Sequence, residues 1–411
     1  MKKIRALTAA LIAAAMLLTP ALADEQSVPA GGVVTEYLND TLYEDFEDSS
    51  TLPASADAVP EIPATSAALV EVSTGTLLFE KNSGQQRPPA SITKIMTMLL
   101  TVEAVESGKI TLDDTVTASE HACSMGGSQI WLEKGETMRL SDLLKSVAVG
   151  SANDAAVALA EHIAGSEEAF AVLMNRRAAQ LDMKDTHFVN ASGLDADGHV
   201  STAADVAKMS CELLKHDIIK NYTTIWMDSV RNGETQLVNT NKLIRFYEGA
   251  TGLKTGTTDK AGYCVAASAK KEGMELVAVI LDGQTSDLRF SAAKSLLNFG
   301  FANFEIASPE IGGEALLQVE VTGGCKPHVE LEGAKQNRLL TEKGRGGDIE
   351  VKIELEQTVE APVAKGQILG TARFLLDGEE VLRKELYAVE EVEKKTFGFS
   401  FSALARRFFC L

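Results

Sequence analysis

The sequence predicts an α/β domain followed by a smaller all-β domain. Strand-like patterns stand on both sides of a helical middle between residues 61 and 305, which is typical of one sheet that contains antiparallel pairs. From residue 306 to residue 393 apolar residues recur with a period of two, as they do in half-buried strands. A chain of 411 residues with 45% hydrophobic composition is long enough to bury both cores.

The α/β domain is expected to begin with a hairpin at residues 66–82, where two apolar runs flank Ser73-Thr74-Gly75. Helical spacing of apolar residues then predicts three helical stretches, at residues 91–108, 141–180 and 202–218. The second stretch is expected to break near Gly150 and at Gly165-Ser166. Two strands and a closing helix complete the domain, at residues 261–271, 275–282 and 288–299.

The all-β domain is predicted from strict alternation. Ile349, Val351 and Ile353 alternate with charged residues, so one face of this strand is expected to be buried. Asp377-Gly378 stands between two strand-like runs, which is a strong hairpin signal.

The two ends of the chain do not fit either domain. Residues 1–23 have a basic start, a short apolar run and a small-residue cleavage site, which indicates a secretory signal peptide; the alternative is an N-terminal membrane anchor. Residues 24–60 are acidic and are expected to form a disordered linker. Residues 394–411 place aromatic residues on one helical face beside Arg406 and Arg407, which suits a membrane-surface helix; a helix docked on the protein, or a disordered end, is the alternative.

Composition excludes several classes of function. The net charge is −19 and the chain has no basic stripe, which argues against a nucleic-acid partner. The five cysteines are few and widely spaced, so they suit one disulfide or buried free thiols rather than a disulfide scaffold. The sequence has no Cys-x-x-Cys and no His-Glu-x-x-His, and we expect neither a metal nor another cofactor.

A Ser-x-x-Lys pair occurs three times, and two other motifs choose among the three copies. Ser151-Ala152-Asn153 is the only Ser-x-Asn, and Lys254-Thr255-Gly256 is the only Lys-Thr-Gly. Only the pair Ser91/Lys94 precedes both motifs. The other pairs, at Ser268/Lys271 and Ser291/Lys294, follow them and are expected to be structural.

The chemistry of these residues can be argued directly. A serine hydroxyl is a weak nucleophile without a base, and three residues on a helix place Lys94 on the same face as Ser91. A lysine with a pKa of about 10.4 cannot act as a base at neutral pH, but burial and a second cation lower that pKa. Lys254 is expected to supply the second cation. A plain helix cap is the alternative for Ser91 taken alone.

Three motifs in this order resemble the D-alanyl-D-alanine carboxypeptidases, the low-molecular-mass penicillin-binding proteins. The stretches LKTGTTDKAGYCVAASA, HFVNASGLDADGHVSTAADVAKMS and APVAKGQILGTARFLLDGEEV are similar to that family too, so the resemblance covers roughly residues 61–395. It implies a transpeptidase/β-lactamase-like catalytic domain at 61–305, with an antiparallel sheet and a helical cluster, and a small all-β domain at 306–393.

The resemblance also implies roles. Ser91 would form an acyl-enzyme with Lys94 as base, and Ser151 would pass a proton to the leaving D-alanine. The backbone N–H groups of Ser91 and Thr257 would form the oxyanion hole. The implied substrate-binding residues are Asn153, Lys254, Thr255, Gly256, Thr257 and Arg289. Thr257 stands where many relatives carry histidine, which puts fine substrate preference in doubt.

The implied protein is an exported, monomeric enzyme that acts on peptidoglycan stem peptides and is acylated by β-lactam antibiotics. Three alternatives remain. A serine β-lactamase would share the motifs, but the Glu-x-x-x-Asn pattern of class A lactamases is absent between residues 154 and 253. A non-catalytic penicillin-binding or wall-binding regulator would not need all the reactive residues. The third alternative is an endopeptidase that cleaves within cross-links. Arg289 is the main argument for a carboxypeptidase instead, because its guanidinium suits the free carboxylate at the end of a stem peptide.

Overall fold

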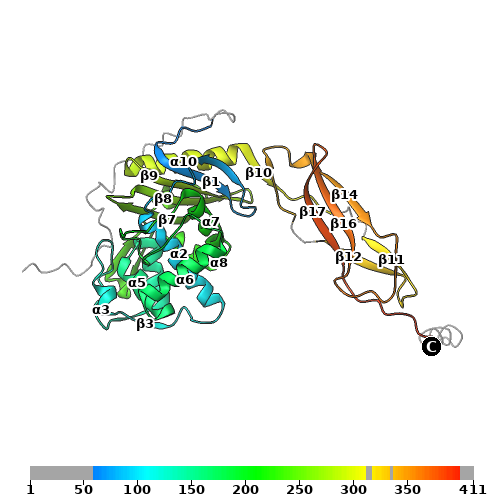
Figure 1. Ribbon diagram of the computed structural model, residues 1–411, viewed down its shortest axis with the longest axis horizontal. Coiled ribbons are helices and arrows are strands. Elements are labelled where there is room, and N and C mark those ends of the chain that lie inside the picture. The colour runs from blue at the N-terminus through cyan, green and yellow to red at the C-terminus, as the bar shows by residue number, and fades with distance from the viewer. Residues whose placement is uncertain (1–58, 312–316, 334–336, 399–411) are drawn as a thin grey trace, which may run out of the picture.

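The computed structural model describes residues 59–311, 317–333 and 337–398 of the chain. The chain forms two domains that lie end to end along the longest axis of the molecule (Figure 1). The expected signal peptide, residues 24–58 of the expected linker and residues 399–411 of the expected tail lie outside the described residues.

The first domain is built on a five-stranded antiparallel sheet with the order β2-β1-β9-β8-β7. Its two central strands β8 and β9 carry near-continuous runs of Val, Ala, Ile and Leu, because helices cover both of their faces. The five strands are β1 (Ala64–Glu71), β2 (Leu77–Lys81), β7 (Ala250–Thr258), β8 (Gly262–Lys271) and β9 (Met274–Gly283).

One long helix, α10 (Ser286–Asn303), lies along one face of the sheet (Figure 1). Its side chains Phe290 and Leu297 are buried in the core between the helix and the sheet. The other face packs on a helical cluster in which α2 and α5 are central. The cluster and its neighbours comprise the short 3₁₀ helix η1 (Ala90–Thr93), α2 (Lys94–Glu106), α3 (Glu120–Cys123), α4 (Leu140–Gly150), α5 (Asn153–Ala164), α6 (Glu167–Gln180), α7 (Ala203–Leu214) and α8 (Asp217–Thr223).

Most of the elements expected in this domain are confirmed. The hairpin, the helical stretches with their breaks at Gly150 and Gly165, and the strands of residues 261–282 are all present. The helix expected from Ser91 instead starts with the 3₁₀ turn η1. Several short elements were not predicted, because each is only three or four residues long: β3 (Thr115–Thr117), β4 (Thr137–Arg139), β5 (Met227–Val230), β6 (Thr235–Val238), η2 (Arg231–Gly233) and α9 (Leu243–Phe246).

The second domain is all β, as expected. Its six-stranded sheet has the order β14-β16-β17-β12-β11-β15 and is antiparallel except for the pair β11–β15. Phe374, Val329 and Leu386 are fully buried in its core. The strands are β11 (Gln318–Thr322), β12 (His328–Glu332), β14 (Glu350–Leu355), β15 (Thr358–Glu360), β16 (Ile368–Leu376) and β17 (Glu379–Ala388), with the 3₁₀ helix η3 (Gly346–Asp348) before β14.

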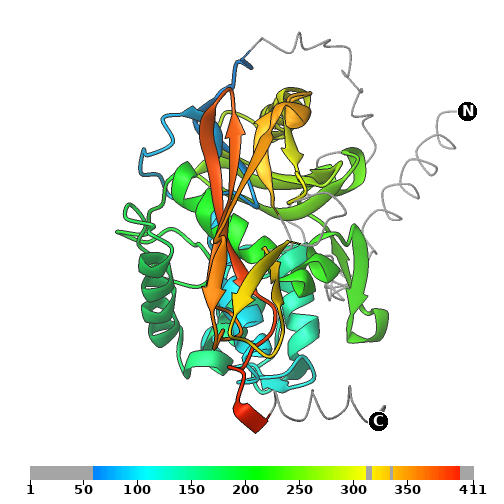
Figure 2. The same cartoon turned by 90° about the vertical axis from the view of Figure 1, so that its right-hand side faces the viewer.

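The two domains are joined by a strand ladder. β10 (Phe304–Ala307) follows α10 directly and pairs with β13 (Leu339–Glu342), so the expected boundary at residue 305/306 falls within a paired strand. Figure 2 views the molecule with the second domain in front. The expected hairpin turn at Asp377-Gly378 joins β16 to β17, and both residues have the positive φ of a type I′ turn.

The four cysteines among the described residues, Cys123, Cys211, Cys264 and Cys325, are free thiols; Cys410 lies outside the described part. No helix in the described ranges is long and apolar enough to span a bilayer.

Candidate active site

Ser91 lies in η1, where the chain is held in an unusual conformation. The preceding residue Ala90 has φ +47°, which costs energy for any residue with a Cβ and is most often found at functional sites. Two glycines make room for this turn. A Cβ on Gly193 would lie 1.9 Å from the carbonyl oxygen of Ala90, and a Cβ on Gly256 would lie 2.9 Å from the backbone nitrogen of Ser91. The backbone around Ser91 is therefore packed too closely for side chains at either position.

Lys94 begins α2 one turn after Ser91, and its side chain is fully buried. Its Nζ donates to Ser91 Oγ at 3.0 Å, to Asn153 Oδ1 at 2.5 Å and to the carbonyl oxygen of Ser192 at 2.6 Å. Burial lowers the pKa of Lys94 from 10.5 to about 7, against the opposing effect of the Asp154 carboxylate. A substantial fraction of Lys94 is therefore neutral near pH 7, as a base requires.

The second motif lies where α4 ends and α5 begins. Ser151 closes α4 in the left-handed conformation, with φ +62°, and is 4% exposed. Asn153 starts α5; its Nδ2 donates to the Gly126 carbonyl at 2.6 Å while its Oδ1 accepts from Lys94. The second motif thus contains a serine with a left-handed backbone, Ser151, and two residues later an amide, Asn153, that contacts the buried Lys94.

The third motif lies on the edge strand β7, next to η1. Lys254 is fully buried, and burial lowers its pKa well below the ordinary value, helped by the charges of Lys94 and Arg289. Lys94 therefore lies close enough to Lys254 to lower the pKa of Lys254. The expected role of Lys254 as the cation that lowers the pKa of Lys94 is not seen, because burial accounts for the shift of Lys94. Thr255 Oγ1 donates to Thr240 Oγ1 at 2.7 Å, which ties β7 to the segment that follows β6.

Arg289 comes from the first turn of α10 and lies behind the end of β7. It is 5% exposed, and its Nη1 donates to Thr257 Oγ1 at 3.0 Å and to the carbonyl oxygen of Gly256 at 3.2 Å. The guanidinium also lies over the rings of Tyr263 and Phe290. Arg289 therefore places positive charge directly beside the residues of the third motif.

Sequence reasoning missed two buried polar residues that support the site. The carboxylate of Asp154 is 0% exposed and accepts from the backbone nitrogens of Ile130 and Leu132, so it fixes the loop before β4. His199 Nε2 and Thr93 Oγ1 are 2.7 Å apart, and burial lowers the pKa of His199 to about 4. Asp154 directly follows the second motif, and His199 lies in the stretch that carried the resemblance.

Within the described residues, one group of side chains has a geometry compatible with a metal ion, and it lies away from these motifs. Glu103, Glu212 and His216 bring ligand atoms within 4.8 Å of one another. Arg177 Nη2 already pairs with both carboxylates, at 2.7 and 2.6 Å. Lys215 Nζ pairs with Glu212 as well, at 2.6 Å, so the two carboxylates already have two cationic partners.

Residues 53–285, more than half of the chain, match the family model described as D-alanyl-D-alanine carboxypeptidase. The chain belongs to the D-alanyl-D-alanine carboxypeptidase family. Residues 310–394 match the C-terminal domain of penicillin-binding protein 5. The chain is therefore a serine-type peptidase with the fold predicted from its motifs.

Curated relatives extend over both domains. The D-alanyl-D-alanine carboxypeptidase DacF of Bacillus subtilis (strain 168) is 43% identical over 338 residues, which cover 81% of this chain and 87% of DacF. DacC of Escherichia coli (strain K12) is 34% identical over 346 residues, 82% of this chain and 86% of DacC.

Solved structures agree with this assignment. Penicillin binding protein 5 from Haemophilus influenzae is 31% identical, with a TM-score of 0.71 over 82% of this chain and 99% of that protein. Penicillin-binding protein D2 from Listeria monocytogenes, in its ampicillin-bound form, is 32% identical, with a TM-score of 0.55 over 59% of this chain and 100% of that protein.

Proposed function

We propose that this carboxypeptidase removes the terminal D-alanine from peptidoglycan stem pentapeptides through an acyl-enzyme on Ser91. Lys94 takes the proton from Ser91 Oγ as the oxygen bonds to the carbonyl carbon of the penultimate D-alanine. The C–N bond then breaks, and the leaving amine of D-alanine takes up a proton. Water hydrolyses the ester and regenerates Ser91.

The residues around Ser91 suit each step. Ser151, which is buried at the junction of α4 and α5, passes the proton to the leaving amine. The backbone N–H groups of Ser91 and Thr257 form the oxyanion hole, supported by the close fit of Gly256 against the Ser91 nitrogen.

Substrate recognition follows from the edge position of β7 and from local positive charge. A peptide substrate lies along β7, with its backbone bonded to the strand and to the amide of Asn153. Lys254, Thr255 and Thr257 bind the terminal carboxylate, whose negative charge favours the protonated form of Lys254, and the charge of Arg289 lies behind them. An enzyme that requires a free terminal carboxylate on its substrate acts at the ends of stem peptides and not within cross-links.

The single observation that carries the proposal is the contact between Lys94 Nζ and Ser91 Oγ, at 3.0 Å, by a fully buried lysine with a pKa of about 7. The test is intact mass spectrometry over time after benzylpenicillin is added to the wild type and to Ser91→Ala. We expect a persistent adduct in the wild type and none in the variant. Absence of an adduct in the wild type would contradict the proposal.

Two further measurements separate the rival activities. Release of D-alanine from a stem pentapeptide, with little cleavage of a cross-linked dimer, identifies the carboxypeptidase. Rapid loss of the adduct together with destruction of the antibiotic would instead identify a β-lactamase.

We also infer that the protein is exported as a monomer and held at the outer face of the membrane by residues 394–411. The composition of this tail supports the inference, with aromatic residues beside Arg406 and Arg407. Deletion of residues 394–411 should release the protein from membranes without loss of D-alanine release. Retention of the truncated protein on membranes would contradict the anchor.

A further inference from the structure

The base Lys94 is held between two segments of the chain. One hydrogen-bond acceptor is Asn153 Oδ1 at the start of α5, and the other is the carbonyl oxygen of Ser192, in a loop between α6 and α7. Since hydrogen bonds to both acceptors orient the amine toward Ser91, the position of Lys94 depends on how firmly each segment is fixed.

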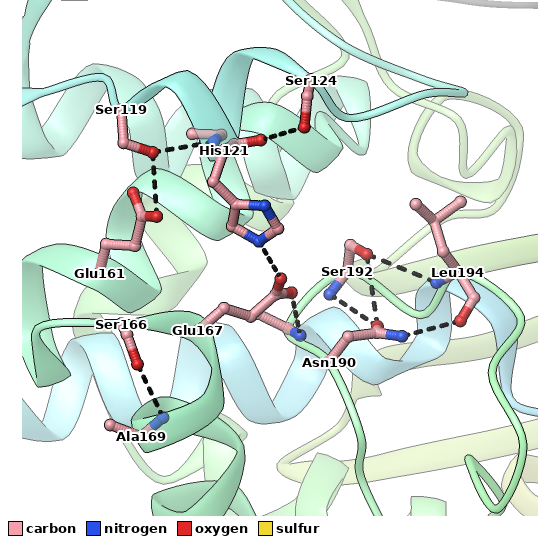
Figure 3. Close-up of polar contacts among 12 residues, drawn as sticks. Ser119, His121, Ser124, Glu161, Ser166, Glu167, Ala169, Asn190, Ser192 and Leu194 are labelled. Atoms are coloured by element: carbon pink, nitrogen blue, oxygen red, sulfur yellow. Dashed lines mark hydrogen bonds and ion pairs between the residues drawn. The ribbon is translucent and has the colours of Figure 1, made fainter.

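The loop with Ser192 is fixed by a buried carboxylate. Glu167 Oε1, at the start of α6, accepts from the backbone nitrogen of Ala191 at 2.9 Å (Figure 3). Thr97 Oγ1, one turn after Lys94 on α2, donates to the carbonyl oxygen of Ala191 at 2.7 Å. The backbone at Ala191, directly before Ser192, is therefore held at its N–H by Glu167 and at its carbonyl by Thr97.

The segment that supports Asn153 is connected to the same carboxylate. Asn153 donates from its backbone nitrogen to the Ser128 carbonyl at 2.7 Å and from Nδ2 to the Gly126 carbonyl at 2.6 Å. Both carbonyls follow α3, which carries His121. His121 Nε2 lies 2.7 Å from Glu167 Oε2, so one carboxylate joins α3 to the loop with Ser192 (Figure 3).

Glu167 is not needed to cap its own helix. Ser166 Oγ accepts from the backbone nitrogen of Ala169 and so caps α6. The side chain of Glu167 is directed away from this cap toward His121 (Figure 3). Its other oxygen accepts from the backbone nitrogen of Ala191. Its two oxygens are thus used to connect segments rather than to end the helix.

We propose that Glu167, braced by His121, is a positioning residue for Lys94, which it controls through the backbone of Ala191 and Ser192. The inference rests on the proposed role of Lys94 as the base. Loss of the brace loosens the loop that covers Lys94 and admits water. The amine then moves out of line with Ser91, and the burial that lowers its pKa is relieved.

The test compares Glu167→Ala with Glu168→Ala in the intact chain. Both remove one carboxylate from the first turn of α6, but Glu168 is exposed and forms its hydrogen bond with its helix neighbour Ser166. The measurement is the rate of acylation by benzylpenicillin between pH 5 and pH 9. We expect Glu167→Ala to slow acylation about tenfold to a hundredfold and to move the acid limb of the profile to higher pH.

Two more variants keep the test independent of folding. Glu167→Gln retains an oxygen for the Ala191 N–H and should recover most of the rate. His121→Gln, at a partly exposed position, should move the acid limb in the same direction by a smaller amount. Glu168→Ala should match the wild type in both rate and profile.

An acid limb that stays at the wild-type pH in both Glu167→Ala and His121→Gln overturns the inference, whatever their thermal stability, because a purely structural role would not change the ionisation of Lys94. Failure of benzylpenicillin to acylate the wild type in the same series would instead contradict the proposed function.

Discussion

The two domains treat charged residues in different ways. The first domain fully buries Lys94, Asp154 and Lys254 close to one another. In the described parts of the second domain, by contrast, the buried polar side chains are the uncharged Asn337 and Thr341. Burial of an ionisable group is costly unless partners compensate for it, so the cost is concentrated where protonation states have to be shifted. The second domain follows the simpler rule of apolar side chains inside and charged side chains outside.

The comparison predicts that a lysine matters for acylation only where it is buried. Lys94→Met keeps the length of the side chain but removes the base, so acylation by benzylpenicillin should slow by about 10²- to 10⁴-fold. The matched control is Lys352→Met on the exposed side of β14, which should leave the rate unchanged. Stopped-flow acylation rates check both. A Lys94→Met enzyme as fast as the control would remove Lys94 from the mechanism.

Addition of a single methyl group should also slow acylation in the first domain and leave it unchanged in the second. In Gly256→Ala the added carbon meets the Ser91 nitrogen at 2.9 Å and the Pro89 carbonyl oxygen at 3.0 Å, so η1 must shift. We expect acylation to slow about a hundredfold. Gly347→Ala in the second domain adds its methyl to open space and should have no effect on acylation. Equal rates in the two variants would show that η1 can absorb the shift.

The buried lysine should also give the enzyme a characteristic pH dependence. Below its pKa of about 7 Lys94 carries a proton and cannot accept another from Ser91. The acylation rate should therefore fall about tenfold for each pH unit below the midpoint and level off above it. A profile of acylation against pH, with circular dichroism to check folding, measures this. A rate that stays constant from pH 8 to pH 5 would argue against a neutral lysine as base.

The smallest effect on acylation is expected from damage to the other core. Phe374 is fully buried in the second domain, and Phe374→Ala should cost that domain about 3–5 kcal/mol of stability. Because the catalytic residues lie in the first domain, the acylation rate should remain at the wild-type value. Thermal unfolding of the variant measures the loss of stability, and its rate of acylation by benzylpenicillin measures the effect on the active site. A parallel loss of rate would show that the ladder between β10 and β13 transmits the damage.

The two domains also differ in how much of their structure could be predicted from the sequence. Alternation at Ile349, Val351 and Ile353 and the turn at Asp377-Gly378 follow local rules, and the structure has the strand and the hairpin there. In the first domain, long helices and central strands were predictable because their apolar periodicity extends over many residues. Short elements such as the β5–β6 hairpin were missed because four residues carry too little pattern.

The candidate site was only partly accessible to this reasoning. Motif order placed Ser91, Lys94 and Asn153 in one site, and the hydrogen bonds of Lys94 join these three side chains. Asp154 and Glu167 were missed, because a buried carboxylate is indistinguishable in sequence from an exposed one on a helix. Both carboxylates accept from backbone N–H groups of segments distant in sequence, and the residue types of those segments do not indicate such a bond.

The close fit of Gly256 against the Ser91 nitrogen has a consequence for how drug resistance could arise. Under the proposed mechanism a β-lactam and a stem peptide need the same narrow space between η1 and β7. A bulkier residue at position 256 would hinder the antibiotic, but it would hinder the natural substrate by the same backbone displacement. A substitution at position 256 that lowers acylation by the antibiotic therefore also lowers the enzyme's own activity. Substitutions that give resistance without this loss have to be at residues that contact the antibiotic but not the stem peptide.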